Sequence, residues 1–136
     1  DGKWIMYTVA DYGTFPIWHS ECQLEMMNLH TGEIVNMDVV NSDRSDTYHS
    51  WSSDSRWFVF ASKRGDGKYG RPYFSHVDEN GLVTKPFVLP QEDPWLYEDC
   101  LRSFNIPDLS NGPVNFDAES IGQMVREVEA ARFAVK

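Results

Sequence analysis

The apolar and polar positions of the chain fall into two similar blocks. Each block opens with a polar turn and an apolar strand-like run, at residues 1–8 and again at residues 54–61. A polar loop and a second strand-like run then lead to a glycine turn, at Gly32 in the first block and Gly81 in the second. The openings are 53 residues apart and the glycines 49, so the first block holds four extra residues before its glycine. We place that excess in the loop 12–21.

Short strands and tight turns that recur at a period near 50 residues are typical of the blades of a β-propeller. The pattern predicts a mainly β fold of about two four-stranded antiparallel blades over residues 1–90, a partial propeller. The run 57–61 is apolar at every position, which indicates a strand buried on both faces. The expected strands are 4–9, 23–29, 33–40, 48–52, 56–62, 72–77 and 83–89.

The pattern changes twice after residue 90. Prolines interrupt the segment 91–116, which we expect to be an extended connection laid on the surface. From Asp117 the apolar residues recur at helical spacing, which predicts a C-terminal helix over residues 117–136. Its apolar stripe should be buried against an open blade face, the nearest large apolar surface. The stripe consists of Ile121, Met124, Val125 and Val128.

Charge and composition exclude several kinds of partner. A net charge of −9 and a pI near 4.7 argue against nucleic acid, because phosphate binding needs a basic patch. No apolar run approaches the length of a membrane span, so we expect no membrane insertion. The two cysteines, Cys22 and Cys100, fit no metal-binding spacing. The sequence does not decide between a disulfide and two half-buried free thiols, although buried thiols are the commoner case.

Catalytic motifs are lacking. The chain has no Gly-x-Ser-x-Gly elbow, and the glycine-rich stretch 64–68 lacks the strand-to-helix context of a phosphate loop. We therefore expect no catalytic residue, no metal and no cofactor. The basic residues of the second block suggest either a docking patch for an acidic partner or a solvated loop edge. They are Arg56, Lys63, Arg64, Lys68 and Arg71.

The loop 12–21 is the strongest candidate for binding. It carries three aromatic residues, a histidine and a glutamate, and long loops on a rigid β scaffold commonly bind partners. We expect five residues to form part of a surface for a protein or a small ligand on one rim: Trp18, His19, Glu21, Arg44 and His49. Two alternatives stay open. Each histidine could instead fix its loop through a backbone hydrogen bond, and the aromatic rings could fold back onto the blade.

The segments 50–64 and 1–7 resemble the Trp-Ser-Pro-Asp-Gly-(Lys/Arg)-x-(Ile/Leu)-x-(Phe/Tyr)-x-Ser repeat of TolB-like, WD-like propellers. Ser53 stands where that repeat has Pro, and Ser55 where it has Gly. Three further segments look like the C-terminal end of exported bacterial members of this family: the loop 12–19, the run 48–52 and the tail 85–91. The resemblance implies a periplasmic, protein-binding propeller and brings no catalytic residues with it.

Two hypotheses of function follow. The first is a non-catalytic periplasmic module, a fragment of a larger TolB-like protein whose chain begins inside a blade, because the lead-in 47–52 has no counterpart before residue 1. The second is the propeller portion of a prolyl oligopeptidase-like peptidase with its catalytic domain elsewhere. The 46 residues after residue 90 are too few for such a domain. Open blade faces also make self-association an expected property of the isolated chain.

Overall fold

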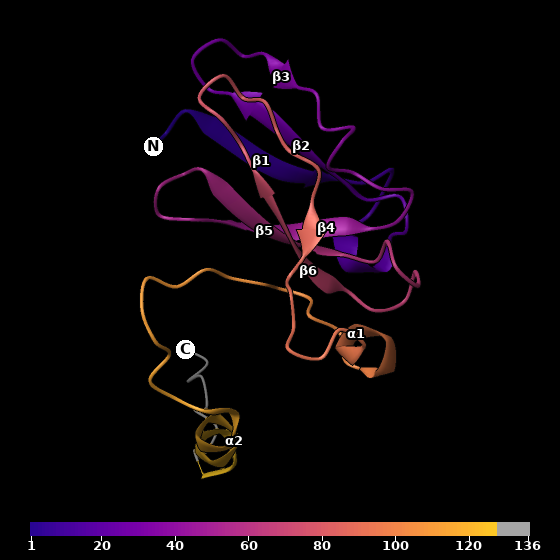
Figure 1. Ribbon diagram of the computed structural model, residues 1–136, viewed down its shortest axis with the longest axis vertical. Coiled ribbons are helices and arrows are strands. Elements are labelled where there is room, and N and C mark those ends of the chain that lie inside the picture. The colour runs from indigo at the N-terminus through magenta and orange to yellow at the C-terminus, as the bar shows by residue number, and fades with distance from the viewer. Residues whose placement is uncertain (128–136) are drawn as a thin grey trace, which may run out of the picture.

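A computed structural model describes residues 1–127, which form two antiparallel β-sheets (Figure 1). Sheet A has the strand order β1-β2-β3 and sheet B the order β4-β5-β6-β7. Sheet A consists of β1 (Trp4–Val9), β2 (Gln23–Asn28) and β3 (Ile34–Val35). Sheet B consists of β4 (Asp46–Trp51), β5 (Trp57–Ser62), β6 (Arg71–His76) and β7 (Phe87–Val88). The prediction of a mainly β fold is confirmed.

The prediction of two four-stranded units is right for sheet B and wrong for sheet A, which has three strands. Two outer strands are also much shorter than expected. The run 33–40 pairs only at β3, because the Asp38 amide then bonds the Asn36 side chain at 2.8 Å and the Val40 amide bonds back to Met37 at 2.9 Å. The run 83–89 contains Pro86, which has no amide hydrogen for a ladder.

The repeat seen in the sequence extends to atomic detail. In each block an aspartate Oδ1 accepts a hydrogen bond from the amide two residues later: Lys3 to Asp1 at 3.0 Å, and Arg56 to Asp54 at 3.1 Å. The residue between them has a positive φ in both blocks, 74° at Gly2 and 58° at Ser55. Ser55 therefore keeps a left-handed turn that normally favours glycine.

The core lies between the two sheets, which pack face to face. Alternating residues of β1 and β2 point inward, and they meet the inward-facing aromatic residues of β5. The buried members of this cluster are Met6, Leu24, Met26, Met37, Val40, Phe58, Phe60, Val77 and Val83. The prediction that run 57–61 is buried on both faces is nearly right: residues 58–61 are buried, and Trp57 remains exposed.

The connecting segment was predicted as an extended connection on the surface, and its part up to Asp108 lies against sheet B. It contains the short helix α1 (Leu96–Asp99) and then runs past Gly70, which accepts a hydrogen bond from the Phe104 amide at 2.9 Å. Phe104 and Ile106 then line a cavity together with Val59, Phe74 and other residues of the outer face of sheet B. This outer face is therefore partly covered by the chain itself.

The helix α2 (Ala118–Glu127) stands apart from both sheets (Figure 1). Its first turn is capped by Asp117, whose Oδ1 accepts the Ser120 amide at 2.7 Å. The expectation that its stripe packs on a blade is wrong for Ile121, Met124 and Val125, whose exposed fractions run from 45% to 74%. The physical reason is that residues 104–108 already lie on the nearby face of sheet B. Val128 and the rest of the predicted helix lie outside the described residues.

Candidate functional site

The loops 10–22, 41–45 and 63–70 meet at one end of the two sheets, which we call the loop end. The Lys63 side chain donates a 2.7 Å hydrogen bond to the carbonyl of Ile17, and its amide bonds Ser45 at 2.9 Å. The Asp46 amide bonds the carbonyl of Cys22 at 2.9 Å. The opposite end, the turn end, carries the turns 29–33, 52–56 and 78–81.

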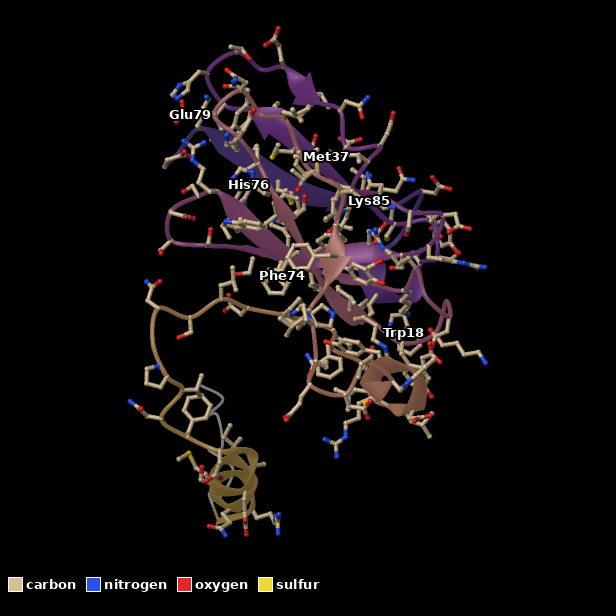
Figure 2. The ribbon with its side chains drawn as sticks, viewed as in Figure 1. Trp18, Met37, Phe74, His76, Glu79 and Lys85 are labelled. Carbon is tan, nitrogen blue, oxygen red and sulfur yellow. The ribbon has the colours of Figure 1, made fainter. Side chains whose placement is uncertain are left out.

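The long loop presents its aromatic residues to solvent. Tyr12 is 73% exposed, Phe15 69% and Trp18 82%. Trp18 is the last residue of the 3-10 turn η1 (Pro16–Trp18) and is labelled in Figure 2 above the short helix near residues 96–99. The alternative in which the rings of Phe15 and Trp18 fold back onto the sheets is therefore wrong. Phe15 has a φ of 57°, a left-handed conformation that is uncommon for an aromatic residue.

His19 and Glu21 hold this loop in shape. The His19 Nδ1 lies 3.0 Å from the Glu21 carboxylate and its Nε2 lies 3.1 Å from the Thr14 carbonyl. The edge of the Tyr12 ring packs on the imidazole at 4.8 Å between centroids. A hydrogen bond from its own backbone, followed by the one to His19, lowers the pKa of Glu21. Both ring nitrogens of His19 are thus engaged within the loop, which fits the loop-fixing alternative.

Arg44 and His49 occupy different settings. Arg44 lies at the loop end, with its guanidinium 4.0 Å from Asp43 and packed beside Gly67. His49 is half-buried inside β4, at the register shift between Thr47 and Ser50. Burial lowers the pKa of His49. The loop end thus gathers four of the five predicted residues, Trp18, His19, Glu21 and Arg44, while His49 belongs to a strand.

The basic residues 56–71 do not form one patch. Arg64 lies beneath the loop end, where it bonds Asp46 at 3.0 Å and the Val40 carbonyl at 2.7 Å. Arg56 points to the turn end and pairs with Glu79 at 3.1 Å. Two of these basic groups are therefore committed to internal contacts at opposite ends of the molecule, and the hypothesis of a single docking patch is wrong.

Sequence reasoning missed a cavity of about 520 Å³ beside the loop end. Three tyrosines line it, Tyr69, Tyr73 and Tyr97, together with Arg71, whose guanidinium lies over the rings of Tyr69 and Tyr97. These residues come from three separate segments, and only the high aromatic content of the chain hints at such a cluster. Burial raises the pKa of Tyr73 and of Tyr97.

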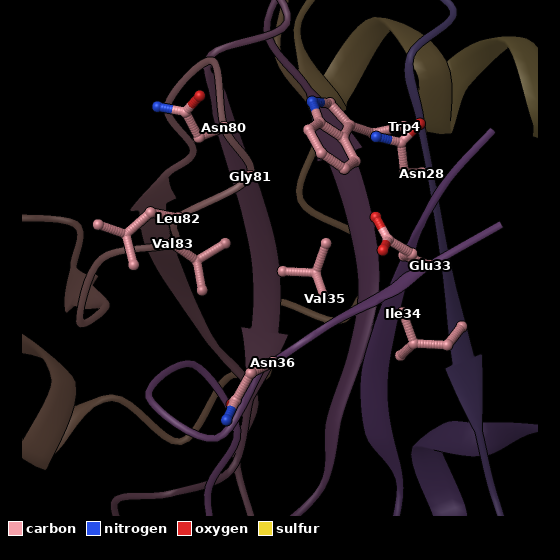
Figure 3. Close-up of a pocket in the computed structure, with 10 residues that line it drawn as sticks. All are labelled: Trp4, Asn28, Glu33, Ile34, Val35, Asn36, Asn80, Gly81, Leu82 and Val83. Carbon is pink, nitrogen blue, oxygen red and sulfur yellow. The ribbon is translucent and has the colours of Figure 1, made fainter. Parts of the chain in front are cut away.

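A second hollow, of about 580 Å³, lies between the sheets at the turn end (Figure 3). Val35 and Val83 face each other across it, and Trp4 closes one side. The Trp4 ring packs so closely on Gly81 that a Cβ there would lie 2.6 Å from it. This contact joins the first block to the turn of the second.

No known protein family, curated protein or solved structure matches the chain. Within residues 1–127, no group of three or more histidine, cysteine or acidic side chains is arranged to hold a metal ion. No helix of this part of the chain is long and apolar enough to cross a bilayer. Both cysteines are free thiols, with Cys22 buried in the core and Cys100 half-buried.

Proposed function

We propose that the chain is a non-catalytic binding module, two blades of a TolB-like propeller that present a platform for a protein partner or a small ligand. The repeat of strands and turns supports this assignment, since the two blocks share the same aspartate turn and positive φ. Location in the periplasm is part of the proposal and rests on the resemblance of the loop 12–19 and the tail 85–91 to exported members of that family.

The observation that carries the proposal is the exposure of three neighbouring aromatic side chains on an anchored loop. Aromatic residues are enriched among the side chains that dominate binding energy, because they bury much apolar area at small entropic cost. The loop that carries Tyr12, Phe15 and Trp18 is held from beneath by Lys63 and internally by His19. A partner would therefore meet a surface that needs little ordering.

The test is capture of a partner from periplasmic extract by the full chain, followed by lysine cross-linking. Lys63 and Lys68 mark the loop end, whereas Lys3 bonds Glu79 at the turn end. We expect cross-links at the two loop-end lysines, and loss of capture in Trp18→Ala. The matched control is Leu82→Ala, which removes a comparably exposed side chain (71%) at the turn end. Capture that survives Trp18→Ala, or that cross-links only at Lys3, would rule out the loop end as the binding surface.

A further inference from the structure

His19 makes two hydrogen bonds that a neutral imidazole cannot make together. Its Nδ1 lies 3.0 Å from the Glu21 carboxylate, and its Nε2 lies 3.1 Å from the carbonyl of Thr14. A carbonyl oxygen only accepts hydrogen bonds, and so does an ionised carboxylate. Both ring nitrogens must therefore carry a hydrogen, which makes His19 an imidazolium in this form of the loop.

The Glu21 carboxyl is ionised over the whole range in which a histidine changes its charge. A hydrogen bond from its own backbone, followed by the one to His19, lowers the pKa of Glu21 from its ordinary value near 4.5. Histidine side chains change their charge between about pH 5 and 8. Throughout that range Glu21 accepts and cannot donate, so the two bonds of His19 exist together only while the imidazole is protonated.

The ring of His19 is enclosed, so water is a poor substitute for either bond. Its side chain is 10% exposed. The edge of the Tyr12 ring packs on it at 4.8 Å between centroids, and a Cβ added at Gly13 would lie 3.4 Å from Nε2. A neutral His19 would turn a ring lone pair toward an oxygen about 3 Å away, and the loop would have to release either Glu21 or Thr14.

The charged groups around the ring come from the loop itself and from the second block. The end of β1 lines the cavity beside the ring with residues 8–10, which are uncharged. Lys63 reaches the loop from the second block, but its ammonium is bonded to a backbone carbonyl of the loop at 2.7 Å. Burial, and then the charges of Glu21 and Asp11, raise the pKa of the Cys22 thiol, so both carboxylates lie close to this part of the loop. Two carboxylates thus stand near the imidazole, against one ammonium that is already bonded.

The Thr14 carbonyl is next to a strained residue. Phe15 has a φ of 57° and a ψ of 68°, a left-handed conformation that is rare for an aromatic residue and disfavoured before Pro16. Such a conformation persists only where its surroundings hold it. Two bonds do so here: His19 holds the Thr14 carbonyl, and the Trp18 amide bonds the Phe15 carbonyl at 3.0 Å. Without the first bond, Phe15 can return to an extended backbone, and the positions of the Phe15 and Trp18 rings change.

We propose that the loop 12–21 is a proton switch. Protonation of His19 closes the loop into the form described above, and loss of that proton releases the Thr14 carbonyl and lets Phe15 relax. The closed form is therefore present below the histidine range and is lost as the pH rises through it. The consequence for binding rests on the proposed function: if the loop end is the binding surface, a partner binds more tightly at about pH 5.5 than at about pH 8.

The test of the switch needs no partner. In the full chain at about pH 5.5, NMR should show hydrogens on both ring nitrogens of His19 and the strong amide–Hα contact that a positive φ gives at Phe15. At about pH 8 we expect the Phe15 contact to weaken, and the Trp18 amide to exchange at least about tenfold faster relative to its intrinsic rate. The readout is local because His49 also makes the unfolding free energy depend on pH. A Phe15 contact and a Trp18 protection that stay the same at both pH values would overturn the proposal.

Glu21→Gln separates a proton switch from a purely structural role of Glu21. A glutamine amide can donate to the bare Nδ1 of a neutral histidine, whose Nε2 hydrogen still bonds the Thr14 carbonyl. At about pH 8 this variant should therefore protect the Trp18 amide about tenfold better than the parent chain does, with no dependence on pH. A loop that is loosened at both pH values in Glu21→Gln would contradict the switch. His30→Gln is the control, since it removes an exposed histidine at the turn end and should leave the pH dependence unchanged.

The link to binding is read separately, by capture of a partner at the two pH values. Capture by the full chain should be stronger at about pH 5.5. Capture that Trp18→Ala abolishes, but that is equal at both pH values, would overturn the switch and keep the loop end as the binding surface. A pH-dependent loop together with capture that survives Trp18→Ala would support the switch and rule out that surface.

Discussion

Arg71 should control whether the connecting segment stays on sheet B. Its guanidinium donates to the carbonyls of Arg102 and Tyr97 at 2.5 Å each and to that of Cys100 at 2.9 Å. It also lies over the rings of Tyr69 and Tyr97. Arg71 is 6% exposed and is the first residue of β6, so it joins the segment to the sheet from a fixed position.

The free energy that Arg71 contributes to docking can be worked out from these three hydrogen bonds. A hydrogen bond that involves a charged group contributes about 1.5–3 kcal/mol, and bonds that share one donor group are not additive. The segment is partly exposed around residues 97–102, so water can reach the released carbonyls. We therefore expect Arg71→Met to weaken docking by about 2–4 kcal/mol, the value of one to two such bonds. In Arg71→Lys the docking of the segment should be weaker than in the parent chain and stronger than in Arg71→Met. An ammonium lacks the planar guanidinium that reaches several carbonyls at once.

The assay is amide hydrogen exchange at Phe104 and Gly70, which bond across the docking contact. A loss of 2–4 kcal/mol corresponds to faster exchange at Phe104 by a factor of about 30 to 1000. Arg102→Met is the matched control, since that exposed residue contributes its carbonyl and not its side chain. Unchanged protection at Phe104 in Arg71→Met would show that apolar contacts alone hold the segment, and the reasoning would be refuted.

Three further predictions concern stability and are checked by denaturant unfolding. Gly2→Ala should cost about 1 kcal/mol, because its φ of 74° disfavours a side chain although no atom lies within 4 Å of the added Cβ. Gly81→Ala should cost more, about 2–4 kcal/mol, since the Cβ would also clash with the Trp4 ring at 2.6 Å; equal costs would contradict the contact. Burial lowers the pKa of folded His49, so the unfolding free energy should fall as the pH drops below about 6.5, the ordinary histidine pKa, down to the folded pKa. His49→Gln should reduce this dependence, and an unchanged pH profile would argue against it.

The strands that carry long apolar runs could be predicted from sequence. β1, β2, β5 and β6 lie where the apolar runs predict them, because burial between two sheets demands those runs. The outer strands could not be predicted in length. β3 ends where the Asn36 side chain accepts the Asp38 amide and donates to the Asp38 carboxylate. Such local competition with the ladder is not visible in the apolar pattern.

The candidate site was only partly visible in the sequence. Exposed aromatic residues in an extra-long loop predicted the surface around Trp18, and the structure exposes it. The role of His19 depends on the Thr14 carbonyl, whose approach is set by the loop conformation and not by residue type. The basic residues were predicted as one possible patch because they are close in sequence. Closeness in sequence does not show to which end of a sheet a side chain points. Arg56 and Arg64 are eight positions apart on the two ends of β5, so they point to opposite ends of the sheet.

The two outer faces of the molecule differ in a way that bears on how it meets partners. The outer face of sheet B carries Phe104 and the residues after it, and Val59 beneath them is buried. The outer face of sheet A has no such cover among residues 1–127, and Ile5 and Ile34 are exposed on it. Stacked repeats need their ends capped, and within residues 1–127 cover is seen on the outer face of sheet B alone. A partner that packs on Ile5 and Ile34 would cover the outer face of sheet A, and Trp18 at the loop end would remain free for a second contact.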